Sequence, residues 1–261
     1  MTMDLGISGR NAIVCASSRG LGRACAEALA RAGVRVVVNG RDPERLARVR
    51  DEIAASTGTE ILAVAADVST AEGREALIGA LPQVDILVNN NGGPPPRDFR
   101  KVDHDALIAG LEANMIAPIA LIQSVVDGMA ERGFGRIVNI TSGSVKAPLA
   151  GLDLSSGARA GLTGFVAGVA RSVARSNVTI NNLLPGAFDT DRIAALMNDQ
   201  ARQSGRSADE IRGQRERSIP AGRFGRPAEF GAACAFLCSA DAGYITGQSI
   251  LIDGGAFPGI L

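Results

Sequence analysis

Short apolar runs alternate with longer amphipathic runs along this chain, and that pattern limits the possible folds more than any other feature. Seven runs are short, apolar and bounded by turn residues, which predicts buried strands at residues 11–15, 34–38, 61–66, 85–89, 136–141, 178–184 and 249–252. Helical spacing fills the segments between them, among them residues 21–31, 107–132, 158–175 and 228–238. Pro118 should break or kink the second of these helices. Alternating strands and helices predict a parallel sheet with helices on both faces, so we expect a single doubly wound α/β (Rossmann) domain over residues 1–261.

Composition excludes several classes of protein. Lys+Arg and Asp+Glu both number 27, so there is no basic excess for binding nucleic acid, and weak mutual repulsion permits self-association. No apolar run is seen that reaches the roughly 18 residues of a membrane span, and residues 1–10 contain no signal-peptide core. We therefore expect a cytoplasmic protein with no membrane partner. The four cysteines have no metal-ligand spacing, so we expect core thiols and no metal site: Cys15, Cys25, Cys234 and Cys238.

A glycine-rich turn joins the first expected strand to the helix after it. Glycines in such a turn let the backbone approach a pyrophosphate, and the free N–H groups of the following helix point at the phosphates. The strand, turn, helix and second strand together predict a dinucleotide site. The candidate ligands in this turn are Ser17, Ser18, Arg19, Gly20, Leu21 and Gly22.

The end of the second expected strand indicates which dinucleotide is bound. NAD-selective sites usually carry an acidic residue there for the ribose hydroxyls. This chain has Asn39-Gly40-Arg41 instead. Arg41 and Arg19 are placed to pair with a 2′-phosphate by charge-assisted hydrogen bonds, so we expect NADP(H) to be preferred over NAD(H). The alternative is that both arginines are solvated surface residues.

Five further motifs follow in order: residues 65–68 (AADV), 89–92 (NNNG), 185–186 (PG) with Thr190, 245–248 (ITGQ) and 253–255 (DGG). With the glycine-rich turn, they resemble the short-chain dehydrogenase/reductase family, in a layout close to the β-ketoacyl carrier-protein reductases, over residues 8–255. The resemblance implies further cofactor contacts at Asp67, Val68, Asn90, Asn91, Gly92, Pro185, Gly186 and Thr190. One departure is Cys15-Ala16, where the family has Thr-Gly; we expect it to reshape the turn without abolishing phosphate binding.

The resemblance also implies a catalytic set of Asn, Ser, Tyr and Lys, with Tyr as the acid. Asn114 and Ser142 match the first two. The segment 159–165 (RAGLTGF) aligns Arg159 with the family lysine and Ser155 with the family tyrosine. A serine hydroxyl is too weak an acid to replace a phenol unaided, and a guanidinium cannot relay a proton, although Arg159 could hold a ribose.

Two nearby residues are candidate replacement acids. Lys146 follows Ser142 closely, and a lysine in an apolar pocket can approach neutrality and transfer protons. Asp153 precedes Ser155, but a surface or capping role is the alternative for both residues. The leading hypothesis is an atypical NADP(H)-dependent oxidoreductase that reduces a carbonyl or oxidises an alcohol. The alternative is a non-redox nucleotide-binding protein, or a lyase-type enzyme, on the same fold.

The substrate side is less informative. Residues 188–222 should form a substrate lid, with Ile193, Leu196 and Met197 as its apolar face, and residues 198–217 should be mobile. Residues 92–96 (GGPPP) should form a stiff wall, but neither feature identifies the small-molecule substrate. The resemblance implies a homo-oligomer, a tetramer or dimer, built through helices 158–175 and 228–238.

Overall fold

The computed structural model describes residues 4–94 and 96–259; Pro95, in the middle of the expected proline wall, lies outside the described residues. Seven parallel strands form one sheet in the order β3-β2-β1-β4-β5-β6-β7. The strands are β1 (Asn11–Val14), β2 (Arg35–Gly40), β3 (Ile61–Ala65), β4 (Ile86–Asn89), β5 (Gly135–Ile140), β6 (Val178–Pro185) and β7 (Ser249–Ile252). This confirms the expected doubly wound α/β sheet.

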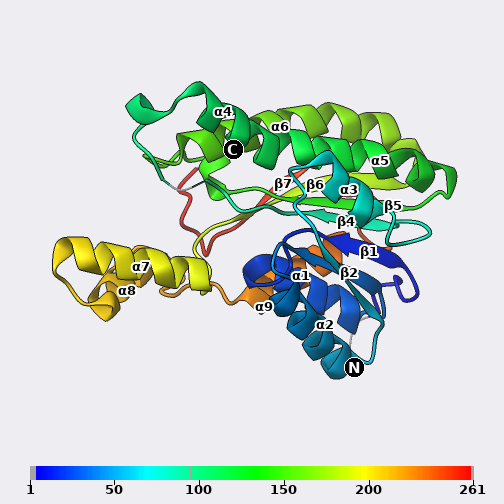
Figure 1. Ribbon diagram of the computed structural model, residues 1–261, viewed down its shortest axis with the longest axis horizontal. Helices are drawn as coiled ribbons and strands as arrows, with labels where there is room; N and C mark the ends of the chain where they lie inside the picture. The colour runs from blue at the N-terminus through cyan, green and yellow to red at the C-terminus, as the bar shows by residue number, and fades with distance from the viewer. Residues whose placement is uncertain (1–3, 95, 260–261) are drawn as a thin grey trace.

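Helices cover the sheet in two layers (Figure 1). One layer consists of α1 (Gly20–Arg31), α2 (Pro43–Thr57) and α9 (Pro227–Leu237), and the other of α3 (Ala71–Ile78), α4 (His104–Leu111), α5 (Ala117–Glu131) and α6 (Asp153–Val173). The central strands pack against both layers, which explains why their sequences are apolar without alternation. All four cysteines are buried free thiols, as the sequence predicted.

The chain reverses its direction of winding at β1, which pairs with β2 on one side and β4 on the other. Ile13 lies opposite Val37 in β2 and Leu87 in β4. The loops after β1 and β4 therefore diverge at the carboxyl edge of the sheet. In open α/β sheets, the crevice at this switch point is where ligands bind.

The segment expected to be mobile is folded into two helices, α7 (Asp191–Ser204) and α8 (Ala208–Arg217). They form an arm that projects from the body of the molecule (Figure 1). The arm has a small core of Met197, Ile211, Ile219 and Phe224. The sequence did contain a signal for α8: Ser207 and Glu210 form a reciprocal capping box at its start.

Two expected helices differ in detail. Helix α6 begins at Asp153, five residues earlier than expected, because the small residues before Ala158 continue the helix without an apolar stripe. The run before β5 is helical throughout but contains a π turn (η2, Glu112–Ile116) between α4 and α5. Pro118 lies in the first turn of α5, directly after this π turn, so the helix continues past the proline with a local change in its hydrogen bonding.

That same run corrects our expectation about membrane-spanning segments. His104–Glu131 is 28 residues long and contains an 18-residue window with a mean hydropathy of 1.5, enough in length and composition to cross a bilayer. Core helices of soluble proteins also meet this criterion, and α5 packs on β4 and β5. Only 33% of its most apolar window is buried, and Leu107, Ile108 and Ile116 are exposed. The run therefore carries an apolar surface that the sheet does not cover.

Candidate functional site

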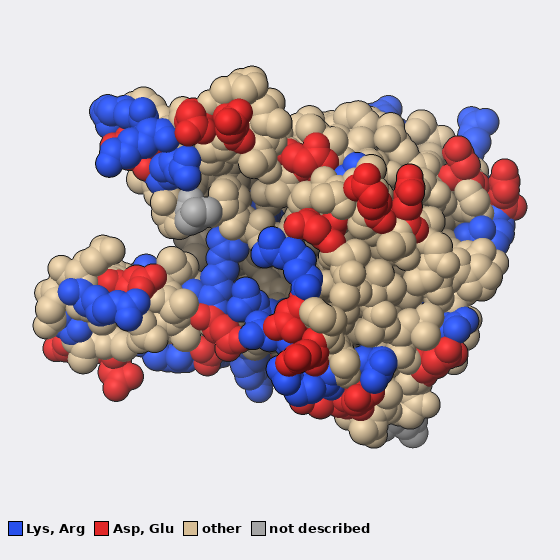
Figure 2. Space-filling model, viewed as in Figure 1, with Lys and Arg blue, Asp and Glu red and all other residues tan. Residues whose placement is uncertain are grey.

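A cleft of about 990 Å³ opens at the carboxyl edge of the sheet, between the body and the α7–α8 arm. Figure 2 shows this hollow with basic side chains gathered around it, and the basic residues in its lining are all arginines. Loops after β1, β2, β3 and β4 form one side, and the start of α7 forms the other. The charged residues that line it are Arg19, Arg41, Asp42, Arg45, Asp67, Arg97, Asp191, Arg192 and Asp199.

The turn after β1 is held in shape by Asn39, at the end of β2. The Asn39 side-chain oxygen accepts a hydrogen bond from the Ala16 N–H at 3.0 Å, and its amide donates to the carbonyls of Val64 and Ala66. The Asn39 N–H in turn donates to Ser17 Oγ, and that hydroxyl donates to the Val14 carbonyl. Asn39 and Ser17 are both buried, and these bonds direct their side chains to the protein's own backbone.

The start of α1 has the shape that a pyrophosphate needs. Arg19 precedes the helix without a side-chain cap, so the first N–H groups are left for another acceptor. Gly20 has a φ of +58°, which favours glycine. A Cβ on Gly22 would lie 2.5 Å from the Ala16 carbonyl oxygen and 2.7 Å from Asn90 Nδ2, so only glycine fits there. These residues fit a bound dinucleotide phosphate.

Three arginines lie where the adenosine end of such a dinucleotide would reach. Arg41 is 81% exposed and makes a loose ion pair with Asp67 at 3.6 Å, so its guanidinium is available to a stronger anion. Arg19 lines the same cleft. Arg45, in the first turn of α2, lines it as well, and the sequence analysis missed it.

The loop after β4 ties the cofactor side of the cleft to the helices behind it. Asn90 Nδ2 donates to the Ala16 carbonyl at 3.2 Å. Asn91 Nδ2 donates to the Ala113 carbonyl and to Ser69 Oγ, while its side-chain oxygen accepts from the Gly92 N–H. The loop is thus fixed by its own side chains, and it lines the cleft together with Val68.

Arg159 connects several segments at the buried end of the site through its hydrogen bonds. Its guanidinium donates to the backbone carbonyls of Ile140, Thr141 and Asn91, and its Nε donates to Ser155 Oγ at 3.0 Å. The side chain is only 7% exposed and has no carboxylate partner among the described residues. Burial, followed by the charge of Arg192, lowers the pKa of Arg159 to about 10, so it stays charged at neutral pH.

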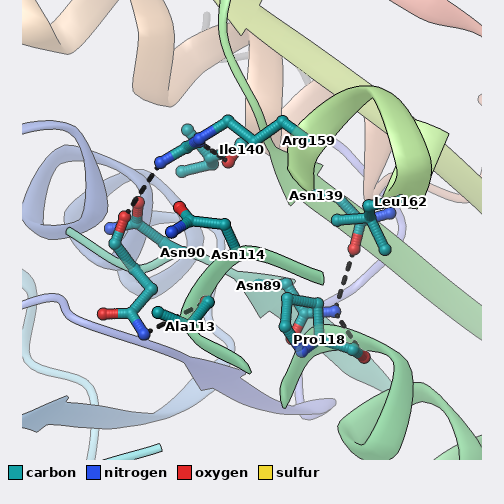
Figure 3. Close-up of a pocket in the computed structure, with 10 residues that line it drawn as sticks. Asn89, Asn90, Ala113, Asn114, Pro118, Asn139, Ile140, Arg159 and Leu162 are labelled. Carbon is teal, nitrogen blue, oxygen red and sulfur yellow. Dashed lines mark hydrogen bonds between the residues drawn. The ribbon is translucent and has the colours of Figure 1, made fainter. Parts of the chain in front are cut away.

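A second cavity, of about 10 Å³, lies beside this guanidinium and is lined by Arg159 and Asn114 (Figure 3), with Asn91 also in its lining. Asn114 sits in the π turn and donates from Nδ2 to the Gly110 carbonyl, but its buried Oδ1 has no partner. A cavity of this size holds about one water, and a buried polar atom without a partner is what such a water satisfies. The π turn thus places the Asn114 side chain in the wall of the cavity that Arg159 also lines.

None of the other candidate catalytic residues, Ser142, Lys146, Asp153 and Ser155, is part of the cleft lining. Ser142 lies just after the end of β5, and its hydroxyl oxygen accepts hydrogen bonds from the N–H and the hydroxyl of Ser144. Lys146 is half-buried with its Nζ 6.0 Å from the centre of the Phe257 ring, and it does not line the cleft. Asp153, exposed at the start of α6, does not line the cleft either. Ser155 is 8% exposed.

The segment after β6 closes the site from the arm side. A Cβ on Gly186 would lie 2.6 Å from Asp253 Cβ, so the Pro185-Gly186 turn packs directly on the residue after β7. Thr190 caps α7 without a side-chain hydrogen bond, and its methyl lies 3.8 Å from a Cβ built on Gly20. The arm therefore begins beside the phosphate turn.

Comparison with known proteins now identifies the family. A family model described as "Enoyl-(Acyl carrier protein) reductase" matches residues 15–256. The chain is 34% identical to the 3-oxoacyl-[acyl-carrier-protein] reductase FabG of Aquifex aeolicus, over 98% of this chain and 100% of that protein. This chain belongs to the short-chain dehydrogenase/reductase superfamily.

A second curated relative and a solved crystal structure also match this chain over nearly its whole length. The acetoacetyl-CoA reductase of Allochromatium vinosum is 33% identical, over 95% of this chain and 98% of that protein. The crystal structure of L-sorbose reductase from Gluconobacter frateurii, complexed with NADPH and L-sorbose, matches with a TM-score of 0.93 and 29% identity, over 99% of this chain and 100% of that chain. The dehydrogenase/reductase fold expected from the motifs is confirmed.

Ala16, the departure from the family's glycine in the phosphate turn, keeps a left-handed backbone with a φ of +43°. A residue with a side chain pays about 1–2 kcal/mol for this conformation. We expect Ala16→Gly to raise the free energy of unfolding by about 0.5–1 kcal/mol, since the added freedom of the unfolded chain offsets part of the gain. Urea unfolding would measure it, with Ala195→Gly in the exposed face of α7 expected to destabilise. A lower stability for Ala16→Gly would contradict the argument.

Proposed function

We propose that this chain is an atypical NADP(H)-dependent oxidoreductase that reduces a carbonyl or oxidises an alcohol without a tyrosine acid. The observation that carries the proposal is the phosphate cradle, in which Gly22 packs on the Ala16 carbonyl beside an uncapped helix start. The family relationship supports the same interpretation, because the matches to relatives named as reductases cover 95–98% of this chain. NADPH consumption over a panel of ketones and oxo acids tests it directly.

The preference for NADP(H) rests on the charges at the end of β2. The solved relatives named as complexes with NADPH support this direction. Arg41 and Arg19 would hold the 2′-phosphate, with Arg45 nearby, and position 39 carries a buried, fully bonded Asn instead of an acid.

Removing the Arg41 charge should abolish most of the preference. Charge-assisted hydrogen bonds contribute about 1.5–3 kcal/mol, and solvent exposure reduces this to about a tenfold effect here. We therefore expect Arg41→Ala to weaken NADPH binding about tenfold in a fluorescence titration and to leave NADH binding unchanged. Arg48→Ala, an exposed arginine of α2 that does not line the cleft, is the matched control. Equal dissociation constants for NADPH and NADH in the parent would contradict the assignment.

Bound NADPH would supply the hydride, and the chain's own groups would manage the oxygen of the substrate. Ser142 and Ser155 are the hydroxyls proposed to hydrogen-bond that oxygen. Arg159 positions Ser155 through the Nε bond and fixes the Asn91 loop at the same time. Asn114 would hold a water behind this group. For the proton we propose Lys146, acting through water because its Nζ lies outside the cleft lining, with Asp153 as the alternative.

Three further assignments complete the proposal. Residues 188–222 act as the substrate lid, consistent with an arm that borders the cleft. The protein is cytoplasmic and forms a homo-oligomer, for which the exposed apolar residues of α4, η2 and α6 (Leu107, Ile108, Ile116, Phe165) supply contact surface. A non-redox nucleotide-binding or lyase-type role is the second candidate, favoured by the serine and arginine at the Tyr and Lys positions.

A further inference from the structure

Arg192, in the first turn of α7, faces the reacting end of the cleft. A Cβ built on Gly93 would lie 3.2 Å from Arg192 Nη2 and 3.3 Å from Ser155 Oγ. The guanidinium and the hydroxyl therefore face the same point, beside the loop after β4. Glycine at position 93 leaves that point free, and Arg192 and Gly93 both line the cleft.

The charge of Arg192 has no counter-ion among the described residues. The acidic residues around it are used elsewhere or lie beyond ion-pair distance: Asp189 pairs with Arg212, and Asp199 pairs with Arg202. Arg159 likewise has no carboxylate partner, and the charge of Arg192 contributes to its lowered pKa. Two guanidinium groups thus lie near one another without an acid between them.

Such an arrangement is unfavourable in the empty protein and becomes favourable when an anion enters. A carboxylate between the two groups would accept a bidentate bond from Arg192 and reduce the repulsion with Arg159. The cofactor phosphates are less well placed to do this. Thr190 is the residue that borders the phosphate turn at Gly20, whereas Arg192 borders Gly93 and Ser155.

We propose that Arg192 binds a carboxylate of the substrate, which makes the preferred substrates short oxo acids whose carboxylate lies within a few bonds of the reacting carbonyl. The inference rests on the proposed oxidoreductase function and names its substrate class. In the reaction, the carbonyl carbon gains a hydride and its oxygen gains a proton, so an oxo acid becomes a hydroxy acid while NADPH becomes NADP+. Arg192 takes no part in either transfer; it orients the substrate.

The test compares oxo acids with their methyl esters, which keep the carbonyl and lose the charge. We expect the parent to show at least tenfold higher kcat/KM for 2-oxobutanoate or 3-oxobutanoate than for the matched ester. Arg192→Gln should lower kcat/KM for the acid about 10- to 100-fold, mainly through KM, because hydrogen bonds to a charged group are the strong ones. The ester rate should be unchanged, and Arg192→Lys should recover part of the loss as a point charge. Arg217→Gln, an exposed arginine at the end of α8 that does not line the cleft, is the control.

Binding separates this inference from the proposed function. Calorimetric titration of the NADP+ complex, which cannot deliver a hydride, with the same acid and ester should give acid binding in the parent and none in Arg192→Gln. If the acid binds selectively but is never reduced, the carboxylate site stands and the redox proposal fails. If acid and ester behave alike in rate and binding, the inference is wrong. If Arg192→Gln weakens NADPH binding tenfold without changing the acid-to-ester ratio, Arg192 is a phosphate ligand and the inference is also wrong.

Discussion

Replacing Arg159 by methionine should lower turnover at least 100-fold while changing the free energy of unfolding by no more than about 1 kcal/mol. The loss of turnover follows from geometry, because Arg159 holds both Ser155 and the Asn91 loop, and a displacement of about 1 Å in a reacting group costs about 10²-fold in rate. The free energy of unfolding should change little, because relief of the buried charge and loss of hydrogen bonds act in opposite directions.

One effect favours the variant. The pKa of Arg159 in the folded protein is about 10, below its ordinary 12.5, chiefly because of burial. The folded state therefore binds that proton less well than the unfolded state does, which costs about 3 kcal/mol at neutral pH and is relieved only as the pH rises above 10. The other effect opposes it: without the guanidinium, the carbonyls of Ile140, Thr141 and Asn91 each lose a donor, at about 1 kcal/mol each. The two nearly cancel.

Urea unfolding and steady-state kinetics on the same preparation check this prediction. Arg159→Lys is the informative companion, because an ammonium keeps the charge but cannot match the planar fork that reaches three carbonyls. It should retain NADPH binding and show an intermediate rate. A variant Arg159→Met that turns over a genuine substrate at the parent rate would remove Arg159 from the site.

Lys146→Met should produce the second large effect, a fall in turnover of about 10²–10⁴-fold with NADPH affinity nearly unchanged. That range is what general acid–base help is worth, and removing the ammonium removes the proposed proton source. Lys146 follows the turn that begins at Ser142, and its Nζ lies 6.0 Å from the centre of the Phe257 ring; methionine keeps an unbranched side chain there without the charge.

Asp153→Asn is the matched variant that tests the alternative proton donor. Ser155→Ala should lower turnover less than Lys146→Met does, because Ser155 is proposed to hold the substrate oxygen without supplying the proton. Parent-like turnover in Lys146→Met together with a large loss in Asp153→Asn would transfer the acid role to Asp153. Parent-like turnover in both would leave solvent water as the source.

The fold could be predicted from the sequence because burial on both faces of a parallel strand leaves a continuous apolar run, as in β1, β2 and β5. The arm was harder to predict. Nine of the twenty residues 198–217 are charged and most of the others are small or polar. The core of the arm consists of four side chains spread over 28 positions, from Met197 to Phe224. The capping box at Ser207 was the available local signal for α8.

In the site, as in the fold, local motifs could be predicted from the sequence and long-range contacts could not. The phosphate turn is a local motif, so its position was predictable. The role of Arg159 was not, since its partners at Ile140 and Asn91 lie 19 and 68 residues away in sequence. Asn39 lines the cleft, and its long-range hydrogen bonds to the backbone of Ala16, Val64 and Ala66 were not predictable from the sequence. Arg192 gave no sequence signal, because it is one of several charges on a polar helix.

The most direct measurement of the central claim is a paired assay of the unmodified protein: fluorescence titration with NADPH and NADH, followed by NADPH consumption with a panel of ketones and oxo acids and NADP+ reduction with the matching alcohols. The account predicts NADPH binding about tenfold tighter than NADH binding, and cofactor turnover with at least one carbonyl compound. NADPH binding without turnover of any carbonyl or alcohol would contradict it, and would establish instead a non-redox use of this dinucleotide fold.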